Sequence, residues 1–145
     1  TPQGAWDVTC LLVQPTSDIV ATDFDGDGKL EILTFSKFHG DTLAIWHEGQ
    51  TRDRYEQVWC DPQKRSFLHA LWAADFNGEK CAVIGNRKDG RDLLLVRYVD
   101  GQYTVDVIDH DLGPANCMVY KHDGSNYIVA AYRETDQLAL YKVVE

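Results

Sequence analysis

Short runs of alternating apolar and polar residues cover most of the chain and predict β-strands. Within the first 60 residues we expect strands at residues 5–13, 18–24, 31–37, 42–48 and 55–60. Pro15, a Gly-containing turn at 38–41 and Pro62 separate or end these runs. No stretch of eleven or more residues repeats its apolar positions with the 3.6-residue period of a helix. The pattern therefore predicts an all-β fold.

The same series of segments then occurs twice more. The second copy has predicted strands at 68–76, 81–85, 92–99 and 103–109, and the third has them at 115–120, 127–132 and 137–143. The first turn of each copy contains Gly26, Gly78 or Gly124, which are 52 and 46 residues apart. A four-stranded unit that recurs every 40–50 residues or so is typical of a β-propeller blade.

We therefore predict one propeller-type domain over residues 1–145, built of four-stranded antiparallel blades in a permuted frame. Its parts are an outer strand at 5–13, blade 1 at 18–60, blade 2 at 67–109, and blade 3 at 114–143, which lacks its outer strand. Three blades are fewer than a closed ring contains. An open arc would leave a strand edge and apolar blade faces exposed, so we expect residues 5–13 to join a blade closed by another segment or chain. A homo-oligomer, with a dimer favoured, and a second chain that supplies the remaining blades are both open.

An acidic loop lies between the predicted strands at 18–24 and 31–37. Aspartates occupy alternate positions in it, and a glycine, a lysine and a glutamate follow: Asp23, Asp25, Asp27, Gly28, Lys29 and Glu31. Three aspartates spaced in this way can surround one cation, Gly28 permits a sharp turn, the Lys29 carbonyl can point inward, and Glu31 can close the shell. We predict a Ca²⁺ site with these ligands: Asp23, Asp25, Asp27, Lys29 through its backbone, and Glu31. The alternative is a solvated Asp/Gly turn without an ion.

The corresponding turns of the other two copies are about two residues shorter than the acidic loop. They contain Asn77-Gly78 and Asp123-Gly124, which are hairpin signals and need no metal. We therefore expect one calcium ion per chain.

The run Val20-Ala-Thr-Asp-Phe-Asp-Gly-Asp-Gly-Lys-Leu-Glu-Ile-Leu33 resembles the FG-GAP or VCBS repeat of integrin-type and of bacterial or fungal β-propellers. The resemblance is specific over residues 18–48 and degenerate over 67–99 and 114–143. In that family the acidic loop joins the innermost strand of a blade to the next strand and holds calcium. The resemblance thus implies the same fold, cofactor and ligands, and it implies one ion because the later copies keep only one carboxylate at the corresponding places.

Composition limits the partners and the compartment. The formal charge of −9 disfavours nucleic acid or an anionic membrane surface as the main partner. No apolar run approaches membrane-spanning length and no leader opens the chain, while Thr1 in first position indicates trimming, processing or excision from a larger protein. Four cysteines lie far apart among apolar neighbours: Cys10, Cys60, Cys81 and Cys117. This arrangement favours buried thiols and a cytoplasmic location, although the spacing leaves one disulfide open.

If the acidic loop lies on one face, the connections on the opposite face form a rim that is rich in cations. The connections are 36–41, 85–92 and 132–136, together with 15–17, 61–69 and 110–116, and their candidate ligand-binding residues are His39, Arg87 and Arg133. Such side chains suit an anionic or polyhydroxylated ligand, for example a sugar or a uronate. Ordinary solvated turns are the alternative.

Two classes of function are consistent with these features. The first is a calcium-stabilised β-propeller binding module that recognises a carbohydrate or protein ligand through its rim loops. The second is a carbohydrate-active enzyme of the polysaccharide lyase or sugar dehydratase type, with a polar site at the propeller funnel. No Ser/His/Asp order, paired-glutamate pattern or phosphate loop is present, so His39, Arg87 and Arg133 are the candidate catalysts of the second class.

Overall fold

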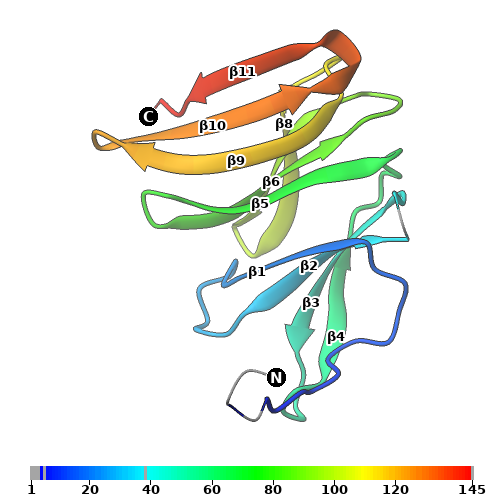
Figure 1. The fold of residues 1–145 in the computed structure, drawn as a ribbon. Coiled ribbons are helices and arrows are strands. Elements are labelled where there is room, and N and C mark those ends of the chain that lie inside the picture. Colours follow the sequence, from blue (N-terminus) through cyan, green and yellow to red (C-terminus); the bar gives the residue numbers. More distant parts are fainter. Residues whose placement is uncertain (1–3, 5, 38, 145) are drawn as a thin grey trace.

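The computed structural model describes residue 4, residues 6–37 and residues 39–144. These residues form three antiparallel sheets in which each strand pairs with the next along the chain (Figure 1). The first sheet contains β1 (Asp18–Thr22), β2 (Glu31–Ser36), β3 (Thr42–Glu48) and β4 (Tyr55–Cys60). The second contains β5 (Leu68–Phe76), β6 (Glu79–Asn86), β7 (Leu93–Val99) and β8 (Gln102–Asp109). The third contains β9 (Pro114–His122), β10 (Ser125–Tyr132) and β11 (Gln137–Lys142), with the 3₁₀ helix η1 (Arg133–Thr135) before β11.

The all-β prediction is confirmed, and each of these strands begins and ends within two residues of its expected position. Turn chemistry explains this agreement. The two-residue loops Asn77-Gly78, Asp100-Gly101 and Asp123-Gly124 all have positive φ at both positions, as a tight hairpin between twisted strands requires.

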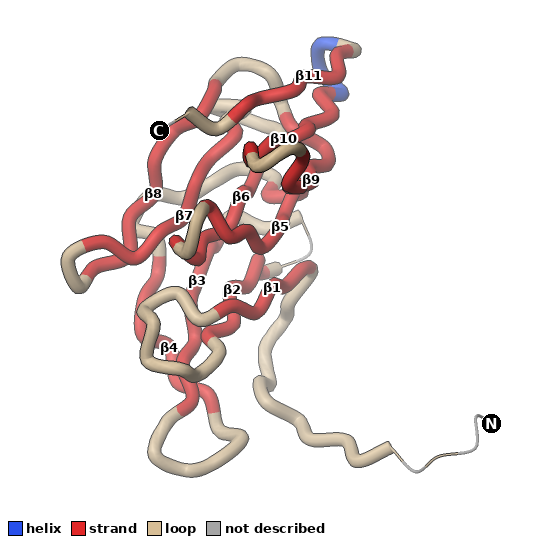
Figure 2. The backbone as a smooth tube through the Cα atoms, turned by 90° about the vertical axis from the view of Figure 1, so that its left-hand side faces the viewer, coloured by secondary structure: helices blue, strands red, loops and turns tan. Residues whose placement is uncertain are grey.

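The strand predicted at residues 5–13 is not formed. Residue 5 lies outside the described residues, and residues 6–13 run as an unpaired segment that leads away from the sheets (Figure 2). The side chains of Trp6, Val8 and Val13 are exposed by 80%, 85% and 92%. A strand needs a neighbour to take up its backbone hydrogen bonds, and residues 6–13 have none among the described residues of this chain.

Two apolar clusters join the three sheets. Phe35, Leu43 and Ile45 of the first sheet pack with Ile84 and Val96 of the second, among others. On the other side of the second sheet, a separate cluster forms around Val83, Leu93, Ile128, Ala130 and Tyr132.

The middle position of the second sheet explains the sequence of β6. Successive side chains of a strand point to opposite faces, so Val83 and Ile84 enter different clusters and both are fully buried. Strand β10 instead alternates buried and half-buried residues, because only one of its faces is covered by another sheet. The first strands of the sheets lie next to one another, since β5 contacts both β1 and β9.

The cysteines differ in their surroundings. Cys81 and Cys117 are buried, and burial raises the pKa of each thiol to about 12. Cys60 is half-buried, whereas Cys10 is exposed. The expectation of a buried thiol is therefore wrong for Cys10, because the segment that contains it pairs with no strand among the described residues.

Among the described residues, no helix has the length and apolar character needed to cross a membrane.

Candidate metal centre

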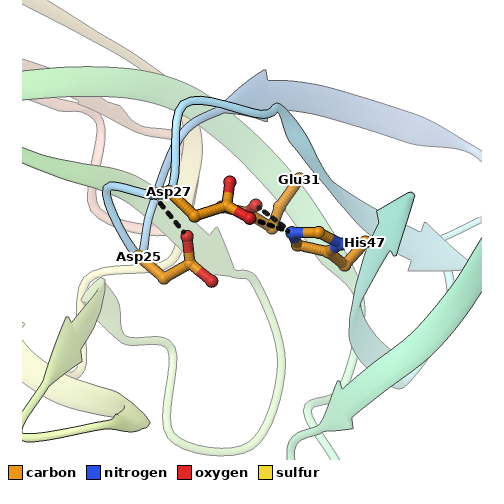
Figure 3. A group of neighbouring side chains, drawn as sticks. All are labelled: Asp25, Asp27, Glu31 and His47. Carbon is orange, nitrogen blue, oxygen red and sulfur yellow. Dashed lines mark hydrogen bonds and ion pairs between the residues drawn. The ribbon is translucent and has the colours of Figure 1, made fainter. Parts of the chain in front are cut away.

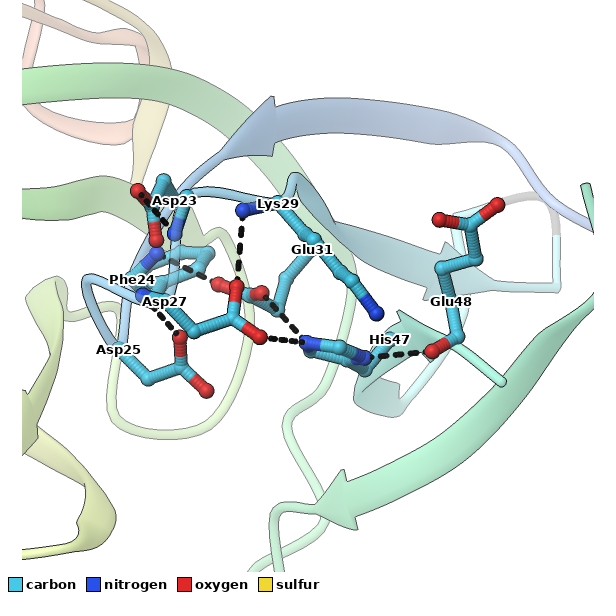
Figure 4. A network of polar contacts seen from close by, with 9 residues as sticks. Asp23, Phe24, Asp25, Asp27, Lys29, Glu31, His47 and Glu48 are labelled. Atoms are coloured by element: carbon cyan, nitrogen blue, oxygen red, sulfur yellow. Dashed lines mark hydrogen bonds and ion pairs between the residues drawn. The ribbon is translucent and has the colours of Figure 1, made fainter. Parts of the chain in front are cut away.

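The acidic loop connects β1 to β2 and folds back on itself through its own carboxylates (Figure 4). Asp25 Oδ1 accepts a hydrogen bond from the Asp27 amide at 3.0 Å, and Asp27 Oδ1 accepts one from the Lys29 amide at 2.8 Å. Asp23 Oδ2 accepts a third from the Gly28 amide at 3.1 Å. Alternate aspartates favour this curl because an Asp side chain readily accepts from the amide two residues further on.

The curl brings three of the predicted ligands together with a residue that was not predicted. One ligand atom each from Asp25, Asp27, Glu31 and His47 lies within 4.8 Å of all the others (Figure 3). The other two predicted ligands lie outside this group of four. The Lys29 amide donates a hydrogen bond to Asp27, and the Asp23 carboxylate accepts one from the Gly28 amide. The predicted set is therefore brought together in part.

Glu31 is the buried member of the group. It is the first residue of β2, and its side chain is fully buried. Its Oε2 atom accepts a hydrogen bond from the Phe24 amide at 2.5 Å, whereas Oε1 is buried, accepts no hydrogen bond, and lies 3.4 Å from His47 Nε2. Burial raises the pKa of Glu31, and the Phe24 hydrogen bond acts in the opposite direction. Such an oxygen costs free energy unless a proton or a cation lies beside it.

His47 reaches the group from β3. Because Ile32 pairs with Trp46, the next pair along the two strands places His47 opposite Glu31. His47 Nε2 lies 3.1 Å from Asp27 Oδ2 and 3.4 Å from Glu31 Oε1, and its Nδ1 lies 2.7 Å from the Glu48 carbonyl oxygen. The Glu48 carbonyl, and after it Asp27 and Glu31, raise the pKa of His47. Hydrogen bonds from the Lys29 amide and from His47 lower the pKa of Asp27.

The missed histidine had a signal in the sequence. The strands predicted at 31–37 and 42–48 form a hairpin, and folding a hairpin brings its two open ends side by side. The open ends are Glu31 on one strand and His47-Glu48 on the other. The register of the two strands decides whether His47 or Glu48 lies opposite Glu31, and the pairing Ser36↔Thr42 fixes that register in the structure.

The residues present fit a divalent cation such as Ca²⁺. Oxygen ligands lie 2.3–2.6 Å from a calcium ion, so two ligands of one ion are at most about 5 Å apart. The four ligand atoms meet that limit. A divalent cation here would offset two of the three carboxylate charges and coordinate the buried Glu31 oxygen, which accepts no hydrogen bond. It would also link the loop to β2 and β3.

The structure brings two of the three predicted rim residues together. His39 stacks on the Phe67 ring with centroids 4.4 Å apart, and the Arg87 guanidinium lies 4.8 Å from the centre of the same ring. His69 stacks on His39 at 5.1 Å and contacts the Ala115 carbonyl oxygen through Nδ1 at 2.7 Å. Together with the cation of Lys88 over Phe67, these side chains form an aromatic and cationic group between the first two sheets.

Arg133, the third predicted rim residue, and His110 lie outside this group. Arg133 is exposed on η1, and its neighbour Glu134 pairs with Arg87 through Nη2 and Oε1 at 2.6 Å. His110 pairs with its neighbour Asp111 at 2.8 Å. A metal cluster of His39, His69 and His110 is therefore absent from the part of the chain that the structure describes.

No protein-family model matches this chain, and no curated protein matches its sequence significantly.

Proposed function

We propose that this chain is a calcium-stabilised β-propeller module that binds a carbohydrate or a protein through its rim loops. The observation that carries the calcium site is the convergence of Asp25, Asp27 and Glu31, with a fully buried Glu31 oxygen that accepts no hydrogen bond. The resemblance of residues 18–48 to the FG-GAP or VCBS repeat supports the same ion in the same loop.

Three features support an assignment of the sheets as propeller blades. Each sheet is an antiparallel meander, its first strand contacts the first strand of the next sheet, and the loops recur in the same places. The third sheet has three strands where the others have four, so β11 has an unpaired edge. Leu138 and Leu140 on β11 are exposed by 74% and 60%.

The missing strand suggests how the ring is completed. Residues 6–13 carry alternating apolar residues but pair with no strand among the residues that the structure describes. They precede the first sheet, which lies at the far end of the molecule from β11 (Figure 1). We propose that residues 6–13 of a second copy pair with β11, which gives a dimer of six blades. A different chain that supplies the other blades is the alternative.

The rim supports binding in preference to catalysis. A pocket of about 360 Å³ is lined by Lys37, His39, Gly40, Asp41, Ser66, Phe67 and Lys88. Lysines beside stacked aromatic rings suit an anionic sugar or a carboxylate-bearing peptide. Arg87 is already held by Glu134, and His39 by its stack on Phe67, which leaves neither positioned as the acid or base of a lyase.

Thermal unfolding with and without calcium tests the cation site. At a free Ca²⁺ concentration about 100-fold above the dissociation constant, binding stabilises the fold by about 2.7 kcal/mol, which corresponds to a rise in Tm of roughly 5–10 °C. Asp25→Ala should remove this rise. Asp123→Ala, in the equivalent turn of the third sheet, should retain it. An equal Tm in calcium and in chelator would contradict the proposal.

Light scattering tests the assembly. The wild-type chain of 16.4 kDa should have the mass of two chains, and a variant that lacks residues 1–13 should have the mass of one. A wild-type monomer at every concentration would contradict the dimer.

A glycan array and a lyase assay separate binding from catalysis. We expect retained binding to acidic glycans that weakens in His39→Ala and persists in His122→Ala, a histidine at the opposite end of the sheets. Formation of an unsaturated sugar product would instead favour the enzyme.

A further inference from the structure

The candidate metal centre contains one nitrogen atom, His47 Nε2, whereas calcium sites are built from oxygen ligands. His47 lies on β3, outside the acidic loop, and its Nε2 atom faces Asp27 Oδ2 at 3.1 Å and Glu31 Oε1 at 3.4 Å (Figure 3). A side chain from a neighbouring strand therefore completes the group that the loop begins.

The contact of His47 with Glu48 occupies Nδ1 and leaves Nε2 as the ring nitrogen that a metal ion among the carboxylates can bind. Nδ1 lies 2.7 Å from the Glu48 carbonyl oxygen (Figure 4). A carbonyl oxygen can only accept a hydrogen bond, so Nδ1 carries a hydrogen. Nε2 faces two carboxylate oxygens, which also only accept, so without a metal it donates to Asp27 Oδ2, and a bound metal ion would take the place of that proton. A backbone acceptor on the far ring nitrogen is the usual arrangement of a histidine that ligates a metal.

Glu31 gives a second and independent indication of a ligand. Its side chain is fully buried, and Oε1 accepts no hydrogen bond. The other oxygen is occupied by the Phe24 amide. Oε1 and His47 Nε2 lie 3.4 Å apart and face the same point, so one metal ion can bind both atoms once the Nε2 proton has left.

We propose that this centre binds a divalent first-row transition-metal ion such as Mn²⁺, with His47 Nε2 as a direct ligand beside Asp25, Asp27 and Glu31. This inference rests on the proposed cation site and specifies which ions that site accepts. Calcium prefers oxygen ligands, whereas Mn²⁺ takes carboxylates and imidazole together at shorter bonds. A neutral imidazole adds a ligand without adding to the negative charge of three carboxylates. The centre should therefore bind Mn²⁺ more tightly than Ca²⁺.

Pulsed electron paramagnetic resonance of the wild-type protein with Mn²⁺ tests the proposal directly. The spin-echo envelope should show modulation from a coordinated imidazole nitrogen, and Ca²⁺ should displace the Mn²⁺ one for one. Mn²⁺ that binds without nitrogen modulation would overturn the inference while leaving a cation site in place. Binding of neither ion, as expected if an imidazolium at His47 already satisfies the carboxylates, would overturn both this inference and the proposed calcium site.

Substitution of His47 should change the affinities for Mn²⁺ and Ca²⁺ by different amounts. His47→Gln replaces the nitrogen ligand by an amide oxygen, which should weaken Mn²⁺ binding by about tenfold or more. The affinity for Ca²⁺ should change by less than about threefold, since an amide oxygen is a normal calcium ligand. Asp25→Ala should weaken both ions. Equal losses for Mn²⁺ and Ca²⁺ in His47→Gln, in a variant with an unchanged circular dichroism spectrum, would contradict direct ligation.

Discussion

Two loops at equivalent places in neighbouring sheets differ in the charges that surround their first aspartate. Between β5 and β6, Asp75 Oδ1 accepts the Gly78 amide at 2.6 Å and Oδ2 binds the Lys80 ammonium at 2.5 Å. Between β1 and β2, Asp23 Oδ2 accepts the Gly28 amide in a similar way, but the surrounding side chains are carboxylates. The turn between β5 and β6 thus has its own cation in Lys80. The loop between β1 and β2 instead gathers carboxylates and one imidazole around a common point.

If the loop between β1 and β2 binds a cation, as we propose, a repeated sheet gains a binding site without a change of scaffold. The strands on either side of each loop pair in the same antiparallel manner. What changes is the loop length and the charge of a few side chains. A site that depends on an external cation should respond to its removal, and a turn with an internal lysine should not.

Glu31→Gln should give the largest effect, and its sign should depend on calcium. With chelator present, the change removes a buried charge that desolvation and the Asp25 carboxylate disfavour, and should stabilise the fold by about 1–3 kcal/mol. With calcium present, the same change removes a ligand and should destabilise the fold relative to wild type. Chemical denaturation in both conditions measures the reversal. A change of the same sign in both conditions would show that Glu31 has no role in cation binding.

Lys80→Glu should give an intermediate effect. It places a second carboxylate beside Asp75 and removes the ammonium that lowers the pKa of that residue. We expect a fall in Tm that is the same in calcium and in chelator, because the two-residue turn is too short to surround an ion. A restoration of Tm by calcium would show that charge alone, without the longer loop, makes a site.

Asn77→Asp should give the smallest effect. It creates alternating carboxylates at Asp75, residue 77 and Glu79 in the second turn, while the tight turn still accepts an aspartate with positive φ. Differential scanning calorimetry should show little change in Tm and no response to calcium. A calcium response here would mean that alternation of acids is sufficient for binding.

The repeat pattern allowed the strands and their division into three antiparallel sheets to be predicted. Alternating strands and Asn-Gly or Asp-Gly turns are local features, so β5 and the hairpins at Gly78 and Gly124 follow from neighbouring residues alone. Residues 6–13 have the same alternation but lack a partner strand within the described chain, and local sequence carries no information about a partner. Residues 6–13 are therefore not a strand in the single chain, and their pairing in a blade closed by another segment or chain stays a prediction.

The candidate site was predicted only as far as the loop itself extends. Asp25, Asp27 and Glu31 are close in sequence, so their convergence depends on one loop. His47 joins them through the register of β2 with β3, and a shift of one residue would have placed Glu48 there instead. The rim illustrates the same limit, since His39 and Arg87 come from different sheets and meet only through Phe67.

The number of calcium ions bound per chain tests the central claim most directly. Native mass spectrometry, supported by titration calorimetry, should find one Ca²⁺ per wild-type chain and none in Asp25→Ala. The loop between β1 and β2 would then be the single cation site of the three equivalent positions. No bound calcium, two or three ions per chain, or one ion retained by Asp25→Ala would contradict this account.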